Sequence, residues 1–233
     1  MKKIFALCLV FTLFSCAELQ DIVNALPTET VINNDMIGNG LKQALDFGID
    51  KQVTKLTQKD GFYKNQLVKI LLPEELQKVD KTLRKVGLGK LADEGIKSLN
   101  RAAEDAVKEA TPIFIDAVKG LSFSDVRNIL LGSDNAATQY LEGKTQQALY
   151  AKFSPVINNS FAKVGANQIW ANLITKYNNL PLTTNVNTDL TDYVTQEALR
   201  GVYAMIAVEE KEIRTKTANR TTDLLRKVFA LQD

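Results

Sequence analysis

Apolar residues recur every three or four positions along most of this chain, and this spacing is typical of amphipathic α-helices. The clearest example lies in the C-terminal third, where a threonine or aspartate at 188–189 can cap a helix that reaches about residue 216. Its expected buried face comprises Leu190, Val194, Ala198, Gly201, Met205 and Val208. No stretch of strand length alternates between apolar and polar residues with turn signals at both ends, so the sequence predicts an all-α fold.

Turn residues and prolines divide residues 34–233 into about eight or nine helices of a single-domain bundle, without a visible internal repeat. A long helix is expected from residue 88 to 119, with a kink or break at Pro112, because proline cannot continue the hydrogen-bond ladder. Pro155 is expected to start a separate helix. The connection over 62–72 fits an extended or a helical conformation, and 178–187 is the longest predicted loop after the N-terminal tether.

Charged residues on two predicted helices are the main candidates for a ligand site or a polar core. Arg101 and Glu104 lie on the long helix, and Glu209 and Arg214 lie on the C-terminal one. Small residues on both helices predict that they pack closely enough to bring the four charges together: Ala102, Ala103 and Ala106 on the first, and Gly201 on the second. The alternative is a scaffold of intrahelical ion pairs and solvated helix faces.

Five further polar residues are weaker candidates. Thr138, Tyr140 and Lys144 follow a predicted helix start, where hydroxyl groups also serve as caps and lysines extend their charge into solvent. Asn100 adjoins Arg101, and Arg220 precedes the last predicted helix, which runs to about residue 230.

The N-terminus has the pattern of an export signal. Lys2 and Lys3 precede an apolar run over 4–14 that is too short for a permanent transmembrane helix. The run ends in Leu13-Phe14-Ser15-Cys16, which resembles a bacterial lipobox and implies cleavage before Cys16 and attachment of diacylglycerol to its sulfur. We therefore expect a lipoprotein signal peptide over 1–15, a lipidated cysteine and tether over 16–33, and a protein held on a bacterial membrane within the cell envelope. The alternative is an ordinary secretory signal with a chance cysteine.

Composition excludes several classes of function. Removal of Lys2 and Lys3 leaves 27 basic and 27 acidic side chains, so the mature chain lacks the positive charge that nucleic-acid binding requires. The chain has no histidine, which excludes Ser-His-Asp catalysis and the usual zinc sites. It contains no glycine-rich phosphate loop and no calcium-binding loop, so we expect no cofactor, no metal and no nucleic-acid partner.

Several short motifs, in this order along the chain, resemble those of one bacterial family. They are Gly61-Phe62, Asn100 to Glu104, Ala136 to Tyr140, Lys144-Thr145, Asp189 to Thr195, Glu209-Glu210 with Ile213-Arg214, Arg220 to Leu225, and Val228-Phe229. The sequence is similar in these motifs to the domain-of-unknown-function 4197 family. This resemblance covers about residues 38–230, and it implies an exported, often lipid-anchored helical protein without an assigned activity.

Two functional hypotheses follow. The first is a lipid-anchored binding or structural protein, whose helices hold a protein or small-molecule partner in an interhelical cleft. The second is an enzyme that acts on an envelope glycan or another polymer through a carboxyl group, with Glu104, Glu197 and Glu209 as candidates. The missing catalytic residue types and the low aromatic content, 7%, favour the first hypothesis.

Overall fold

The computed structural model describes residues 34–85, 87, 89–163, 170–171, 174–175 and 190–232. The predicted signal peptide, the tether and the predicted loop over 178–187 lie outside these residues. By their contacts, residues 34–233 form one compact unit, separate from residues 1–33.

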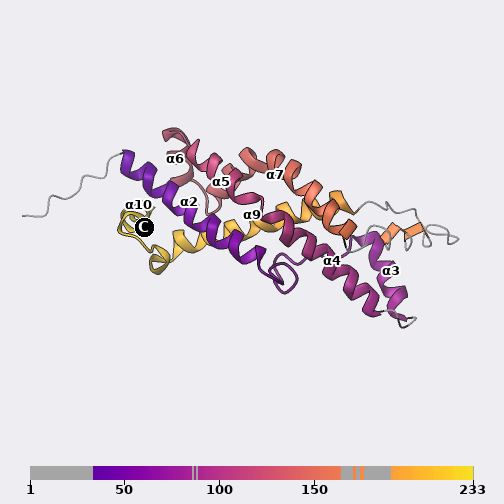
Figure 1. Cartoon of the computed structure of the whole chain (residues 1–233). Helices are drawn as coiled ribbons and strands as arrows, with labels where there is room; N and C mark the ends of the chain where they lie inside the picture. The colour runs from indigo at the N-terminus through magenta and orange to yellow at the C-terminus, as the bar shows by residue number, and fades with distance from the viewer. Residues whose placement is uncertain are drawn as a thin grey trace, which may run out of the picture. The chain divides into compact units, whose positions relative to one another are not determined.

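Within the described residues the chain forms α-helices, two short 3-10 turns and no strand, which confirms the all-α prediction (Figure 1). The helices are α2 (Asn34–Thr57), α3 (Glu74–Lys85), α4 (Gly89–Val107), α5 (Ala110–Lys119), α6 (Phe123–Leu130), α7 (Ala136–Lys163), α9 (Thr191–Thr215) and α10 (Asp223–Phe229), and the 3-10 turns are η1 (Thr217–Asn219) and η2 (Ala230–Gln232).

The longest helices share one core. α7 packs against α4, α5 and α9, while α2 packs against α5, α9 and α10 (Figure 1). Four fully buried phenylalanines contribute much of the apolar surface: Phe62, Phe114, Phe153 and Phe161. No helix in the described part of the chain is long and apolar enough to cross a bilayer.

Pro112 breaks the predicted long helix upstream of its own position. α4 ends at Val107 and α5 begins at Ala110, so the break falls at residues 108–109. Pro112 has no N–H to donate to the carbonyl of Lys108, four residues earlier, and its ring would clash with that carbonyl in a continuous helix. The missing hydrogen bond therefore explains the position of the break.

The connection between α2 and α3 consists of turns followed by residues without regular secondary structure, so it is not the helix that the sequence left as one alternative. Phe62, Val68, Ile70 and Leu72 are buried, so this connection contributes to the core although it is not helical. It begins at Gly61, where a Cβ atom would lie 2.4 Å from the carbonyl oxygen of Leu56. Glycine is thus required by the close approach of the chain to the end of α2.

The prediction that Pro155 starts a new helix is wrong, because α7 runs through it without interruption. A proline inside a helix costs about 3 kcal/mol relative to alanine. Phe153, Ile157 and Phe161 are buried on both sides of Pro155, and α7 packs against α4, α5 and α9. We attribute the continuity of α7 to this packing, which outweighs the lost hydrogen bond.

Two details of the C-terminal helix also differ from the prediction. Val208 is exposed, and the neighbouring Glu209 is buried in its place. α4 and α9 do contact each other. However, Gly201 faces the α2–α3 connection, because a Cβ atom there would lie 2.7 Å from Phe62 Cε1 and 3.3 Å from Val68 Cβ.

Candidate functional site

Arg101 and Glu104, both on α4, bind the turn that follows α2. Arg101 Nη1 lies 2.5 Å from Glu104 Oε2, and Arg101 Nη2 lies 2.5 Å from Asp60 Oδ1. Glu104 Oε1 also accepts hydrogen bonds from the backbone N–H of Phe62 at 3.1 Å and of Tyr63 at 3.5 Å. The buried carboxylate of Glu104 is therefore compensated by one cation and by backbone donors, and the pair fastens the turn to α4.

Asp60 completes this network from an uncommon backbone conformation, with φ at 70°. Its carboxylate lies between Arg101 and Lys64, whose Nζ is 3.0 Å from Asp60 Oδ2. The hydrogen bond from Lys64, with the charge of Arg101 as a further cause, lowers the pKa of Asp60 below its ordinary value. The left-handed turn is thus held by ion pairs on its single acidic side chain.

Asn100 performs a similar task one residue earlier on α4. Its Oδ1 accepts a hydrogen bond from the backbone N–H of Ile70 at 2.8 Å, and its Nδ2 donates to the carbonyl oxygens of Ile70 and Ile96, each at 2.8 Å. The side chain is fully buried. Asn100 exchanges two hydrogen bonds with the backbone of Ile70, so it satisfies backbone groups of the connection that no helix or sheet satisfies.

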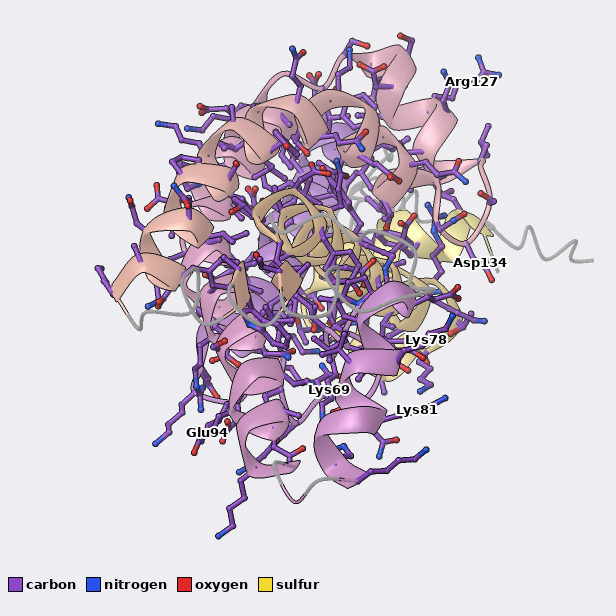
Figure 2. All side chains as sticks on the ribbon, turned by 90° about the vertical axis from the view of Figure 1, so that its right-hand side faces the viewer. Lys69, Lys78, Lys81, Glu94, Arg127 and Asp134 are labelled. Atoms are coloured by element: carbon purple, nitrogen blue, oxygen red, sulfur yellow. The ribbon has the colours of Figure 1, made fainter. Side chains whose placement is uncertain are left out.

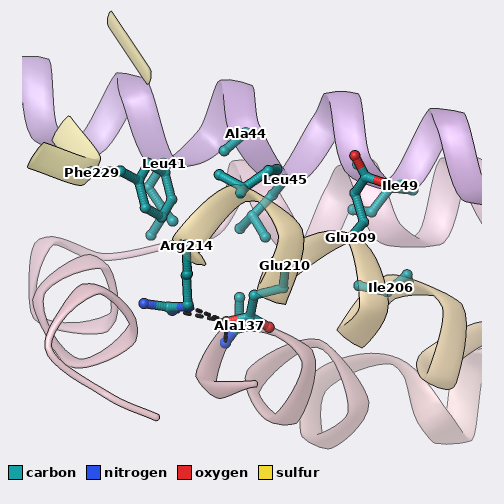
Figure 3. A pocket seen from close by; sticks show the side chains of 12 residues that line it. Leu41, Ala44, Leu45, Ile49, Ala137, Ile206, Glu209, Glu210, Arg214 and Phe229 are labelled. Atoms are coloured by element: carbon teal, nitrogen blue, oxygen red, sulfur yellow. Dashed lines mark hydrogen bonds and ion pairs between the residues drawn. The ribbon is translucent and has the colours of Figure 1, made fainter. Parts of the chain in front are cut away.

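Glu210 and Arg214 form a buried ion pair on α9 that joins two other helices (Figure 3). Glu210 accepts hydrogen bonds from the backbone N–H of Ala137 and of Thr138, each at 2.8 Å, and from the Thr138 hydroxyl at 2.8 Å. Those donors belong to the first turn of α7, where a negative charge is favourable.

Arg214 binds the C-terminal end of another helix, α6. It donates to Glu210 Oε1 at 2.8 and 3.0 Å, and also to the carbonyl oxygens of Ile129 at 2.8 Å and Leu130 at 3.3 Å. These carbonyls terminate α6, where a positive charge is favourable. Glu210 and Arg214 together therefore hold the start of α7 and the end of α6 against α9.

Arg220 closes the C-terminal end of α9. It is only 2% exposed, and it donates to the carbonyl oxygens of Ile213 at 3.1 Å and Arg214 at 2.9 Å. The guanidinium carbon atoms of Arg214 and Arg220 lie 6.0 and 5.9 Å from the centre of the Phe229 ring. Cation–π contacts thus link the end of α9 to α10.

Glu209 faces α2. Its Oε1 lies 2.7 Å from Lys51 Nζ, and its Oε2 accepts a hydrogen bond from Gln52 Nε2 at 2.7 Å. Glu209 and Gln52 are both buried, whereas the Lys51 side chain is about half exposed. This arrangement pairs the buried carboxylate with a cation that stays in contact with water.

A small cavity lies between α2 and α9, and Glu209 and Glu210 are among the residues that line it (Figure 3). Apolar side chains dominate its wall, with Leu41, Leu45, Ile206 and Phe229 among them. Its volume is only about 20 Å³. A single water molecule needs roughly 10–15 Å³ by this measure, so the cavity holds no more than about one water and is too small for an organic ligand.

The four main candidates do not form one constellation. All four are among the described residues, and no hydrogen bond or ion pair joins Arg101 or Glu104 to Glu209 or Arg214. Arg101 and Glu104 hold the turn after α2, Glu209 pairs with α2, and Arg214 belongs with Glu210. The prediction that the four charges come together is therefore wrong. The small residue Gly201 brings α9 against Phe62 and Val68 of the α2–α3 connection, and not against the alanines of α4.

A family model that matches most of the chain shows the family to which the chain belongs. The family described as "Protein of unknown function (DUF4197)" matches residues 31–230. The chain belongs to the DUF4197 family. No curated protein and no solved structure matches it.

The DUF4197 match confirms the resemblance drawn from the short motifs, and it includes every ion pair described above. It starts at residue 31, so it does not include Cys16. Two acidic residues of these networks, Asp60 and Glu210, are not among the candidates that the sequence indicates. The signal for Glu210 is its place four residues before Arg214, at the end of a second apolar stripe through Leu199, Tyr203 and Ile206.

The remaining candidates have separate roles. Thr138 holds Glu210, whereas Lys144 is exposed and its Nζ lies 5.7 Å from the centre of the Tyr140 ring. Burial raises the pKa of the Tyr140 hydroxyl, with the charge of Asp125 as a smaller cause. Glu197 pairs with Arg200, three residues later on α9. In the described part of the chain, no group of three or more Cys, Asp or Glu side chains could hold a metal ion.

Proposed function

We propose that this DUF4197 protein is a lipid-anchored module of the bacterial cell envelope that binds a partner without catalysing a reaction. Leu13-Phe14-Ser15-Cys16 supports the anchor. The state of the buried charges supports a role in binding or structure, because the buried carboxylates of Glu104, Glu209 and Glu210 already accept hydrogen bonds from cations, amides or backbone N–H groups. None of these carboxylates is free to protonate a leaving group or to activate water.

We place the interhelical cleft of this module at one open hollow, here called the α2–α6 groove. It has a volume of about 350 Å³ and is lined by Asn34, Ile37, Phe123, Arg127, Leu130, Leu131 and Leu231. Ligand sites are concave, mostly apolar and of this size or larger. The groove is the observation that carries the proposal, since it offers the space and the apolar surface that the internal cavity lacks.

The anchor is tested by metabolic labelling with a fatty acid that carries a chemical handle. The wild-type chain and a Cys8→Ser variant should both take up the label, because Cys8 lies inside the predicted signal peptide. Cys16→Ser should lose it. Label on the Cys16→Ser protein, or an unlabelled wild-type chain in the same cells, would overturn the assignment.

A further inference from the structure

The α2–α6 groove has apolar walls that the described residues leave uncovered. Leu131 is 70% exposed, Leu231 54% and Phe123 48%. They come from α6, from the residue that follows it, and from the 3-10 turn η2, so their exposure is shared by separate elements rather than due to one loose end. Neighbouring apolar side chains that are exposed together around a hollow are the usual mark of a surface that meets a partner.

We propose that the α2–α6 groove docks on the lipid bilayer, with Phe123, Leu131 and Leu231 entering the boundary between headgroups and acyl chains. This inference rests on the proposed lipid anchor at Cys16. It names the partner of the groove as a lipid surface.

The position of the groove on the chain favours this partner. Asn34, the first residue of α2, lines the groove, and it follows Cys16 by 18 residues. An extended chain of that length spans at most about 60 Å. A lipid on Cys16 would therefore keep this end of α2 within reach of the membrane, where the effective concentration of the bilayer is high.

Arg127 adds a charge of the right sign. It lines the groove, is exposed and points away from the helices (Figure 2). Within the part of the chain that the structure describes, its side chain makes no ion pair or hydrogen bond. The acidic residue on the same helix, Asp125, is already engaged by the backbone N–H and the hydroxyl of Ser122. Arg127 is thus free to reach lipid phosphates while the apolar residues lie deeper.

The opposite end of α2 supplies a matched control. Leu67 is 54% exposed, the same fraction as Leu231, but it lies in the connection that follows α2. The 24 residues of α2 rise by roughly 36 Å, which separates the two leucines along the helix axis. If exposure alone caused lipid contact, Leu67 and Leu231 would behave alike.

The experiment uses the complete lipoprotein, with one of Leu131→Cys, Leu231→Cys or Leu67→Cys, reconstituted into phosphatidylcholine vesicles. Cys8 leaves with the signal peptide and Cys16 is blocked by lipid, so each variant should accept one thiol-reactive fluorophore per chain. Brominated acyl chains should quench the fluorophore at residues 131 and 231 at least about threefold more than at residue 67, because only buried probes approach the bromine atoms. All three sites are exposed, and a melting temperature close to that of the wild type confirms that each variant is folded.

Each other result has a defined meaning. Equal quenching at the three sites, or no quenching at residue 131, overturns the docking proposal. Fluorescence at residue 131 that depends on the protein density in the vesicle, without quenching by bromine, means that a second copy covers the groove. Two labels per chain would refute the anchor instead; the same variants with Cys16→Ser would then be mixed with vesicles, where docking still requires the contrast between residues 231 and 67.

The charge is tested separately in vesicles that contain anionic phosphatidylglycerol. Arg127→Glu should lower the quenching at residue 131 to about half or less, because an acidic residue is repelled by the anionic surface. Lys59→Glu, a charge reversal beyond the other end of α2, should leave it unchanged. Equal effects of both reversals would remove Arg127 from the proposal.

Discussion

Glu210 and Arg214 lie one turn apart on α9, and each binds the end of a different helix: Glu210 holds the N-terminus of α7 and Arg214 the C-terminus of α6. Both side chains are about 95% buried, with exposures of 5% and 6%. Replacement of one partner would leave the other charge buried and unpaired, which is more costly than the loss of the attraction itself.

Glu210→Ala should therefore lower the free energy of unfolding by about 3–5 kcal/mol, since it also removes the acceptor for two backbone N–H groups of α7. Urea unfolding measures the change. Glu212→Ala is the control on the same helix, because Glu212 pairs with the exposed Lys216, and such pairs contribute about 0–1 kcal/mol. A loss below 1 kcal/mol for Glu210→Ala would show that the pair does not hold the helices.

Glu104→Ala should loosen the turn after α2 in particular. The backbone N–H groups of Phe62 and Tyr63 lose their acceptor, so their amide hydrogen exchange should become at least about tenfold faster, and stability should fall by about 2–4 kcal/mol. Glu104→Gln keeps an acceptor oxygen and should show a smaller effect. Unchanged exchange at Phe62 in the alanine variant would contradict the role given to Glu104.

Alanine substitutions at two glycines should change the stability in opposite directions, because Phe62 lies close to one of them, Gly201. Gly201→Ala should destabilise the protein by about 1–3 kcal/mol, because its Cβ would lie 2.7 Å from Phe62 Cε1. Gly143→Ala, in the middle of α7 with no neighbouring atom within 4 Å of the new Cβ, should stabilise it by about 0.5–1 kcal/mol. Thermal unfolding of both variants gives the comparison, and equal signs would show that the contact of Gly201 is not tight.

Stability at high pH should depend on Tyr203, which lies on α9 against Phe114. Burial raises the pKa of the Tyr203 hydroxyl to about 12, although its hydrogen bond with Thr145 opposes the shift. The folded state binds the proton more tightly than the unfolded state, so stability should fall as the pH rises from about 10, the ordinary tyrosine value, towards 12. Tyr203→Phe should be less stable at pH 8 and should lose less stability over that range. A constant difference between the two proteins from pH 8 to 12 would contradict this.

Removal of metal ions should leave the fold unchanged. The chain has no histidine, and the acidic residues in the described networks are bound by cations or by backbone N–H groups. The melting temperature should therefore be the same with and without a chelator. A drop that added Ca²⁺ or Mg²⁺ reverses would reveal a carboxylate site outside these networks.

Much of the fold follows from helical spacing and from turn residues, because both act locally. The expected buried face of the C-terminal helix is confirmed at every position but Val208, and the break near Pro112 is confirmed as well. Pro155 shows the limit of local reasoning, since tertiary packing keeps α7 continuous against the preference of one residue.

The candidate charges were harder to place than the helices. Arg101 and Glu104 could be recognised as a pair from their spacing, but their third partner, Asp60, comes from a turn 41 residues away from Arg101. Glu210 lies in an acidic cluster with Glu209 and Glu212, and composition does not tell that the first two are buried and the third is not. The α2–α6 groove depends on three separate segments and on their relative positions, which no periodicity encodes.

The contacts of Glu210 and Arg214 also bear on how the protein folds. They join residues that are 72 to 85 positions apart in the chain, so they form only when α9 meets α6 and α7. We expect these contacts to form after the folding transition state, and interactions that form so late act mainly on the unfolding rate. We therefore expect this pair to slow unfolding. Its loss should shorten the lifetime of the folded protein while the refolding rate stays nearly the same.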